Sequence, residues 1–243
     1  MPSGQIAAVT IDLDDTLFDQ RLWLDGAWQA VGTAGAVFGL DPEALISRLR
    51  VIAAEGSDRG RIIDRALLDL GVPQWELPAV VPGLVAAFRS HAPASLPCYP
   101  GVGEALEAVR RWVPVGLITD GDPHVQRAKL RALGLREAFD VIVFSDELGR
   151  RHRKPSPEPF LRALRELGVE PAHAVHIGDR PAKDVVGARG VGMRAIRVRT
   201  GEYRDHPDDP QAAPWRVFDR ATEALHWLAV QLAATGPSRL LAD

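Results

Sequence analysis

The stretch Ile11-Asp-Leu-Asp-Asp-Thr-Leu-Phe18 places three carboxylates directly after the apolar run Ile6–Ile11. An apolar run of this length predicts a strand that is buried in a sheet. Like charges at the end of such a strand repel one another, so the acidic cluster lowers the stability of the folded chain unless another interaction offsets the repulsion. Asp12 and Asp14 are two residues apart and would point to the same side of an extended chain. The stretch therefore predicts a buried strand that ends at a site where negative charge is needed.

Four further short runs have the continuous apolar character of strands that are buried on both faces. Together with the first, the predicted strands are Ile6–Leu13, Val113–Thr119, Val141–Phe144, Ala174–Ile177 and Arg194–Val198. Amphipathic patterns that predict helices alternate with the later strands, at Gly103–Trp112, Val125–Leu133, Glu158–Leu167 and Ala182–Arg189. This alternation predicts the α/β class with a doubly wound parallel sheet.

A long segment separates the first two predicted strands, and it exceeds what a single crossover helix needs. Its helical patterns lie at Trp23–Val37, Pro42–Ala54, Gly60–Leu70 and Ala79–His91. We therefore expect a small helical module at residues 17–97, inserted after the first strand. Beyond residue 200 we expect a loop, an edge strand at Val217–Phe218 and a helix at Ala221–Leu232.

The composition excludes several classes of protein. The 243 residues carry a net charge of −3, so no strong field favours nucleic acid or an anionic membrane. No apolar window reaches the roughly 18 residues of a membrane-spanning helix, and the first residues lack the features of a secretory signal. The single Cys98 excludes an internal disulfide and a multi-cysteine metal site. We expect a cytoplasmic monomer or homodimer without nucleic-acid or membrane partners.

Polar residues follow the predicted strands, and ligands of open α/β sheets collect at the carboxyl ends of strands. Four chain segments supply them: Asp12, Asp14, Asp15 and Thr16; Thr119, Asp120 and Gly121; Lys154; and Gly178, Asp179 and Asp184. The carboxylates of Asp12, Asp14, Asp179 and Asp184 would repel one another unless a cation lay between them. Because Mg²⁺ prefers oxygen ligands, the set predicts a magnesium site.

A phosphoryl group fits beside such a cation, because Lys154, Thr119 and turn amides can hold its oxygens. One of Asp12 and Asp14 would attack phosphorus while the other handles the proton of the leaving group. Each residue alone also has a structural explanation, since aspartates after strands often form turns and single lysines are usually solvated. For Asp15 we favour that explanation. For the others, the combination at successive strand ends favours phosphoryl transfer.

Four segments with these residues occur in order: DLDDT at 12–16, LITDG at 117–121, RKPSPEPF at 153–160 and HIGDRPAKDVVGARGVGM at 176–193. In these motifs the chain resembles the haloacid dehalogenase-like hydrolase superfamily over residues 6–200. The resemblance implies a Rossmann-like catalytic core of residues 1–16 and 98–243, with a small α-helical cap at 17–97. It also implies a Mg²⁺-dependent phosphatase that hydrolyses a small phosphorylated metabolite, a sugar phosphate or a nucleotide, through an aspartyl-phosphate.

The resemblance further implies a role for each motif residue. Asp12 would be the nucleophile, and Asp14 would protonate the leaving oxygen and then activate water. Dehalogenases of this superfamily carry Tyr at the position of Asp14, so a carboxylate there favours ester hydrolysis. The implied phosphate ligands are Thr119, Asp120, Gly121 and Lys154, and the implied Mg²⁺ ligands are Asp12, Asp14 (through its carbonyl), Asp179 and Asp184. Asp184 would act through water or by orienting Lys154.

Substrate choice is expected to depend on the cap, because the core contacts only the phosphoryl group. Trp23, Arg59 and Arg61 are candidate specificity residues, although packing of the tryptophan and solvation of the arginines are the more frequent explanations for such residues. Two alternatives stay open at this point: a sugar phosphomutase of the same superfamily, and a phospho-accepting, receiver-like signalling module. Receiver domains lack a helical insert of this length.

Overall fold

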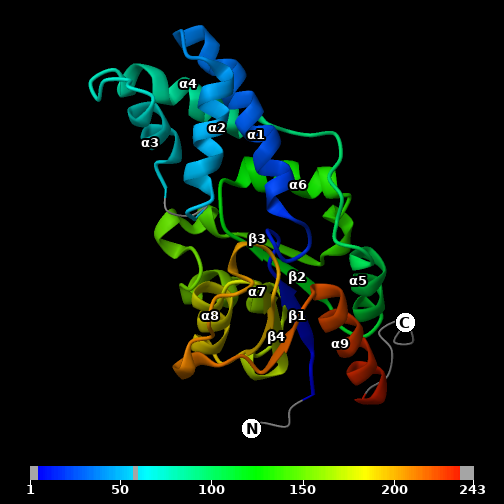
Figure 1. Cartoon of the computed structure of the whole chain (residues 1–243). Coiled ribbons are helices and arrows are strands. Elements are labelled where there is room, and N and C mark those ends of the chain that lie inside the picture. The colour runs from blue at the N-terminus through cyan, green and yellow to red at the C-terminus, as the bar shows by residue number, and fades with distance from the viewer. Residues whose placement is uncertain (1–4, 57–59, 236–243) are drawn as a thin grey trace. The chain divides into compact units, whose positions relative to one another are not determined.

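The computed structural model of the chain describes residues 5–56 and 60–235. Within them, six strands form one parallel sheet in the order β3-β2-β1-β4-β5-β6. Figure 1 labels strands β1 to β4 of this sheet. The strands are β1 (Ala8–Ile11), β2 (Val115–Thr119), β3 (Val141–Phe144), β4 (Ala174–Gly178), β5 (Arg194–Val198) and β6 (Arg216–Phe218). The predicted α/β class with a doubly wound parallel sheet is confirmed.

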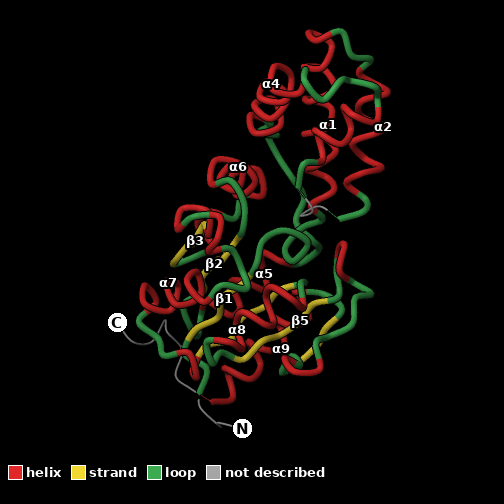
Figure 2. Tube along the Cα trace, turned by 90° about the vertical axis from the view of Figure 1, so that its left-hand side faces the viewer, coloured by secondary structure: helices red, strands yellow, loops and turns green. Residues whose placement is uncertain are grey.

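Helices cover both faces of the sheet (Figures 1 and 2). Helices α5 (Val102–Arg110) and α9 (Ala221–Thr235) pack together on one face, while α7 (Pro157–Leu167) and α8 (Val186–Gly190) lie on the other. Strands β1, β2 and β4 are buried along their whole length, which explains their continuous apolar sequences. The strand order reverses between β1 and β4, and this is where an open α/β sheet binds its ligands.

Local signals in the sequence begin and end the helices that flank the site. The Asp122 carboxylate accepts a hydrogen bond from the His124 amide (2.9 Å) and caps α6 (Pro123–Leu133), which connects β2 to β3. Helix α6 ends at Gly134, which has a φ of 67°, a conformation that glycine adopts without strain.

One predicted helix has a different form. Instead of a regular helix over Ala182–Arg189, a π-helical turn (Pro181–Val185) precedes α8. The carboxylate of Asp184 accepts a hydrogen bond from the Arg180 amide (3.0 Å), so its side chain folds back onto the start of the turn. The π-helical turn thereby places an acidic side chain next to the end of β4, as such turns often do at functional sites.

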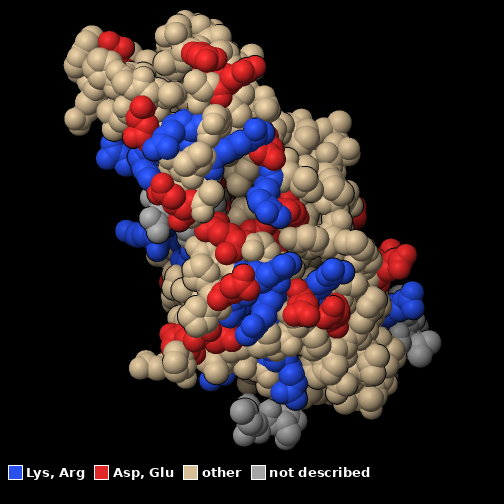
Figure 3. Space-filling view, in the orientation of Figure 1, with Lys and Arg blue, Asp and Glu red and all other residues tan. Residues whose placement is uncertain are grey.

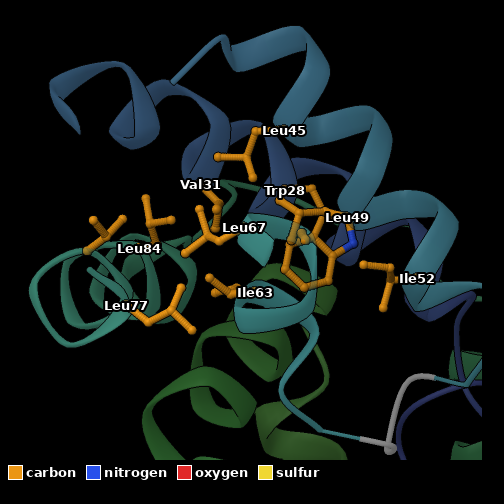
Figure 4. Packing of buried hydrophobic residues seen from close by; sticks show 11 residues of the cluster. Trp28, Val31, Leu45, Leu49, Ile52, Ile63, Leu67, Leu77 and Leu84 are labelled. Atoms are coloured by element: carbon orange, nitrogen blue, oxygen red, sulfur yellow. The ribbon is translucent and has the colours of Figure 1, made fainter. Parts of the chain in front are cut away.

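The segment Arg21–Leu96 forms a second compact unit, separate from the unit Met1–Gln20 and Pro97–Asp243 that contains the sheet. Its helices are α1 (Gln20–Gly35), α2 (Pro42–Ala53), α3 (Ile62–Asp69) and α4 (Leu77–Ser90). Their apolar faces meet in a core around Trp28, Leu49, Leu67 and Leu84 (Figure 4). This unit therefore has a hydrophobic core of its own.

Acidic and basic side chains are interspersed on the face of the molecule shown in Figure 3. This distribution agrees with the small net charge of −3. None of the helices in the described part of the chain is long and apolar enough to cross a membrane.

Candidate functional site

Three buried carboxylates lie together at the carboxyl ends of β1 and β4. Asp12, Asp179 and Asp184 each place one oxygen within 4.8 Å of the others. The parallel pairing of the two strands sets this arrangement, because the Asp12 amide donates to the Ile177 carbonyl (2.9 Å). Asp12 is 5% exposed, Asp179 0% and Asp184 1%, so water screens their mutual repulsion poorly.

Lys154 supplies positive charge to this cluster. Its Nζ lies 2.5 Å from Asp12 Oδ1, 2.7 Å from Asp184 Oδ1 and 3.1 Å from the Ile118 carbonyl. Burial disfavours an ammonium ion, but the two carboxylates outweigh it and raise the pKa of Lys154 above its ordinary value. Lys154 is therefore charged in this structure and compensates for part of the acidic cluster.

The negative charge that Lys154 does not offset fits a divalent cation. Burial raises the pKa of Asp12 to about 7, and burial together with Asp184 and Asp12 raises the pKa of Asp179 well above its ordinary value. The Oδ2 atom of Asp179 is buried without a hydrogen-bond partner in the described part of the chain. A divalent cation would favour the ionised forms of Asp12 and Asp179 and would give the buried Asp179 oxygen a partner. A donor set of carboxylate oxygens suits Mg²⁺. The residues of this cluster therefore fit such an ion.

The loop after β2 borders the same cluster. Thr119 is the last residue of β2, next to β1 in the sheet, and its hydroxyl accepts a hydrogen bond from Gln126 Nε2 (2.6 Å). The Asp120 carboxylate accepts from the Ser145 hydroxyl (2.7 Å) and from the Lys154 amide (3.1 Å). Gly121 has a φ of 121°, which strongly favours glycine. The side chain of Asp120 thus ties the β2 loop to the segment that carries Lys154.

Asp14 lies outside the group of three carboxylates. Its Oδ1 accepts from Lys129 Nζ (2.6 Å) and its Oδ2 from Gln126 Nε2 (2.8 Å). The expectation of an extended chain through Asp14 is wrong, because β1 ends at Ile11 and Asp15 has a φ of 58°. Asp12 and Asp14 consequently contact different partners.

Asp15 has the structural role expected for it. Its carboxylate accepts hydrogen bonds from the Gln20 amide (3.1 Å), the Gln20 side chain (2.8 Å) and the Glu202 amide (3.2 Å). Its backbone carbonyl accepts from the Thr200 hydroxyl. These contacts fix the chain where it leaves β1 and join it to the segment after β5.

Three buried polar residues of the site are absent from the sequence predictions. Gln126 and Lys129 lie one turn apart on α6, and His176 lies in the middle of β4, each at most 5% exposed. His176 Nδ1 is 2.9 Å from the Thr10 hydroxyl and its Nε2 is 3.1 Å from Asp184 Oδ1. The histidine could have been noticed as a titratable residue inside an otherwise apolar strand.

The candidate specificity residues belong to the helical unit. Trp23 is buried and packs against Phe88 and His91, with ring centroids 5.1 and 5.5 Å apart. Arg61 precedes α3, and its exposed guanidinium is 3.4 Å from Asp64 Oδ1. Arg59 lies outside the described residues. A role for these residues in specificity stays a prediction.

All the lysines of this chain lie near the carboxyl ends of the strands, beside the acidic residues described above. There are three of them, Lys129, Lys154 and Lys183. Lys129 contacts Asp14, Lys154 lies in the acidic cluster, and Lys183 Nζ is 3.7 Å from Asp120 Oδ2. Arginine, in contrast, is spread over the rest of the chain.

The chain is similar to a family model, to two phosphatases and to a solved dehalogenase. A family model described as haloacid dehalogenase-like hydrolase matches residues 6–192. The chain is 35% identical over 227 residues to a glyceraldehyde 3-phosphate phosphatase of Methanopyrus kandleri, a match that covers 90% of this chain and 96% of that protein. It is 43% identical over 119 residues to a phosphoserine phosphatase of Thermus thermophilus, covering 49% of this chain and 46% of that one. A solved 2-haloacid dehalogenase from Pseudomonas syringae is 28% identical with a TM-score of 0.64, covering 95% and 99% of the two chains.

Proposed function

This chain belongs to the haloacid dehalogenase-like hydrolases and is a phosphomonoester hydrolase, and we propose that it hydrolyses a small phosphorylated metabolite through an aspartyl-phosphate on Asp12 with the aid of Mg²⁺. The observation that carries this proposal is the Lys154 ammonium, which is buried between the carboxylates of Asp12 and Asp184. A nucleophilic oxygen and a phosphate-binding cation thus lie side by side at the ligand-binding edge of the sheet.

The proposed reaction has two steps. An oxygen of Asp12 attacks phosphorus, the bond from phosphorus to the ester oxygen breaks, and the protonated form of Asp14 gives that oxygen its proton, so an alcohol leaves and Asp14 becomes a carboxylate. Asp14 then takes a proton from water, whose oxygen attacks the aspartyl-phosphate and releases inorganic phosphate from Asp12. Lys154 and Thr119 donate to the phosphoryl oxygens in both steps and stabilise their charge.

Asp12, Asp179 and Asp184 would hold Mg²⁺, and the carbonyl of Asp14 is a further candidate ligand. When bound, the ion supplies positive charge that draws phosphoryl oxygens towards the acidic residues. Without it, the site contains more carboxylates than one ammonium can offset. The raised pKa of Asp12 supports this assignment, as does the Asp179 oxygen, which has no hydrogen-bond partner among residues 5–56 and 60–235.

A phosphate ester is favoured over a halogenated acid because position 14 is a carboxylate, which can protonate a leaving oxygen. The relatives named for glyceraldehyde 3-phosphate and phosphoserine support a short sugar phosphate or similar ester rather than a nucleotide. In this proposal the unit Arg21–Leu96 is the cap that selects the substrate. The receiver-like alternative is not retained, since the family match spans residues 6–192.

Phosphate release tests the proposal. Sugar phosphates, phosphoserine, nucleotides and p-nitrophenyl phosphate are incubated with the protein in Mg²⁺ and, separately, in EDTA. We expect release with Mg²⁺, a drop of about 100-fold or more in EDTA and recovery when Mg²⁺ is added back. Activity that survives EDTA contradicts the role of the ion. Isomerisation of a sugar phosphate without net release identifies the phosphomutase alternative instead.

Gly178→Ala tests the position of Asp184. A Cβ at residue 178 would lie 2.3 Å from Asp184 Cγ, so the carboxylate must move away from Lys154. We expect a loss of about 10- to 100-fold in phosphatase activity, as for other residues that support metal and catalytic groups. Gly190→Ala is the matched control, because a Cβ there meets nothing within 4 Å. Equal activity of both variants contradicts the assignment of Asp184.

A further inference from the structure

We propose that Gln126 and Lys129 of α6 are positioning residues, which hold the Asp14 carboxylate and the Thr119 hydroxyl in the orientation that the second step of hydrolysis requires, in which Asp14 takes a proton from water. This inference rests on the proposed phosphatase mechanism, in which Asp14 transfers protons. The motifs at the strand ends do not include either residue. Both come from α6, one turn apart, and their side chains point to the carboxyl ends of β1 and β2.

Lys129 is buried because Asp14 pairs with it. A lysine is rarely as little exposed as 5% unless an anion compensates for its charge. Its Nζ lies 2.6 Å from Asp14 Oδ1, and the Asp14 side chain is itself only 17% exposed. Since the pair is largely shielded from water, the ammonium fixes one oxygen of Asp14 far more firmly than a surface ion pair would.

Gln126 fixes the other oxygen and joins it to the β2 strand end. Its Nε2 donates to Asp14 Oδ2 (2.8 Å) and to the Thr119 hydroxyl (2.6 Å). A carboxylate can only accept, so the nitrogen end of the amide must face Asp14. Because the Thr119 oxygen then accepts from Gln126, its own hydrogen is available to donate to a phosphoryl oxygen. One amide group therefore orients the proton-transferring carboxylate and a phosphate-binding hydroxyl together.

Lys129 and Gln126 each hold a different oxygen of Asp14, and both residues belong to the same helix, α6. With Lys129 on Oδ1 and Gln126 on Oδ2, Asp14 has both oxygens fixed by one helix. The start of that helix is capped by Asp122 directly after the β2 loop, so its first turns are tied to the end of β2. A side chain held in this way loses little freedom when it reaches the reacting oxygen, which is the benefit of preorganisation.

A double-mutant cycle with p-nitrophenyl phosphate tests the inference. We compare kcat and KM of the wild type, Lys129→Met, Asp14→Asn and the double variant. Lys129→Met should lower kcat by about 10- to 100-fold with KM changed by less than about threefold, because ground-state binding does not depend on Asp14. In the Asp14→Asn background the same substitution should cost nothing further, since its effect passes through Asp14.

Arg131→Met is the control, because Arg131 is an exposed cation on the same helix and should keep wild-type kcat. Thermal unfolding shows whether each variant folds. If Lys129→Met does not fold, Gln126→Leu takes its place in the same cycle, and its loss of kcat should be smaller, but not absent, in the Asp14→Asn background, because Gln126 also orients Thr119. An equal loss of kcat in both backgrounds, or no loss in the wild-type background, overturns the inference. A wild type that releases no phosphate from any ester overturns the proposed function and the inference with it.

Discussion

Asp12→Asn eliminates phosphate release, with an expected loss of at least about 10⁴-fold in kcat, because an amide cannot accept a phosphoryl group in place of the carboxylate. The substitution changes almost nothing else. Asn keeps the size of the side chain and an oxygen that can accept from Lys154, which lies 2.5 Å from Asp12 Oδ1. It also removes one negative charge from a cluster in which burial already disfavours ionised Asp12. Folding stability should therefore be retained or increased.

Three measurements separate this outcome from general damage. Steady-state kinetics with p-nitrophenyl phosphate gives the loss of kcat, and urea unfolding gives the stability. Mass spectrometry after rapid acid quenching should find one added phosphoryl group on the wild type and none on Asp12→Asn. The exposed Asp219→Asn is the control and should behave as the wild type. A phosphorylated Asp12→Asn protein assigns the nucleophile to another residue.

Lys154→Met is expected to lower both activity and stability. The Lys154 ammonium contacts two buried carboxylates, Asp12 and Asp184, which are 5% and 1% exposed. Removing one partner of a buried ion pair leaves an uncompensated charge and typically costs about 3–5 kcal/mol of folding free energy. Turnover should fall by about 10³-fold or more, because the phosphoryl oxygens lose their cationic donor.

Urea unfolding with and without Mg²⁺ gives this prediction a second test. Because a bound divalent cation offsets the same carboxylates, Mg²⁺ should restore part of the stability that Lys154→Met loses, but not its activity. Arg150→Met removes an exposed cation four residues away and should change neither quantity. A Lys154→Met protein as stable as the wild type in EDTA contradicts the ion pairs described here.

Most of the sheet and much of the acidic cluster could be predicted from the sequence, for one physical reason. Parallel strands that are buried on both faces have continuous apolar sequences, so β2 and β4 are visible as runs that end at Thr119 and Ile177, within one residue of the strand ends in the structure. Their carboxyl ends must meet at one edge, which brings Asp12, Asp179 and Lys154 together without knowledge of the strand order. The strand order itself, with β1 between β2 and β4, came only from the structure.

The residues that the sequence did not reveal lie on helices or depend on irregular turns. Gln126 and Lys129 are polar residues of an amphipathic helix, where polar side chains are expected to face water. Only the packing of α6 shows that these two face inward. The π-helical turn that aims Asp184 at Lys154 likewise differs from a regular helix by one residue of register, which apolar periodicity does not resolve.

The confinement of lysine to one edge of the sheet makes this protein unusual as a target for amine chemistry. Within these 243 residues, the lysines that a reagent for primary amines can acylate are Lys129, Lys154 and Lys183. Every lysine adduct would therefore lie next to an acidic residue of the proposed site. Labelling of lysine in this chain therefore reports on that site, without a background from lysines elsewhere. Because an acylating reagent reacts with the neutral amine, and Lys129 and Lys154 are ammonium ions paired with carboxylates, the rate of labelling with and without phosphate would measure how readily these ion pairs open.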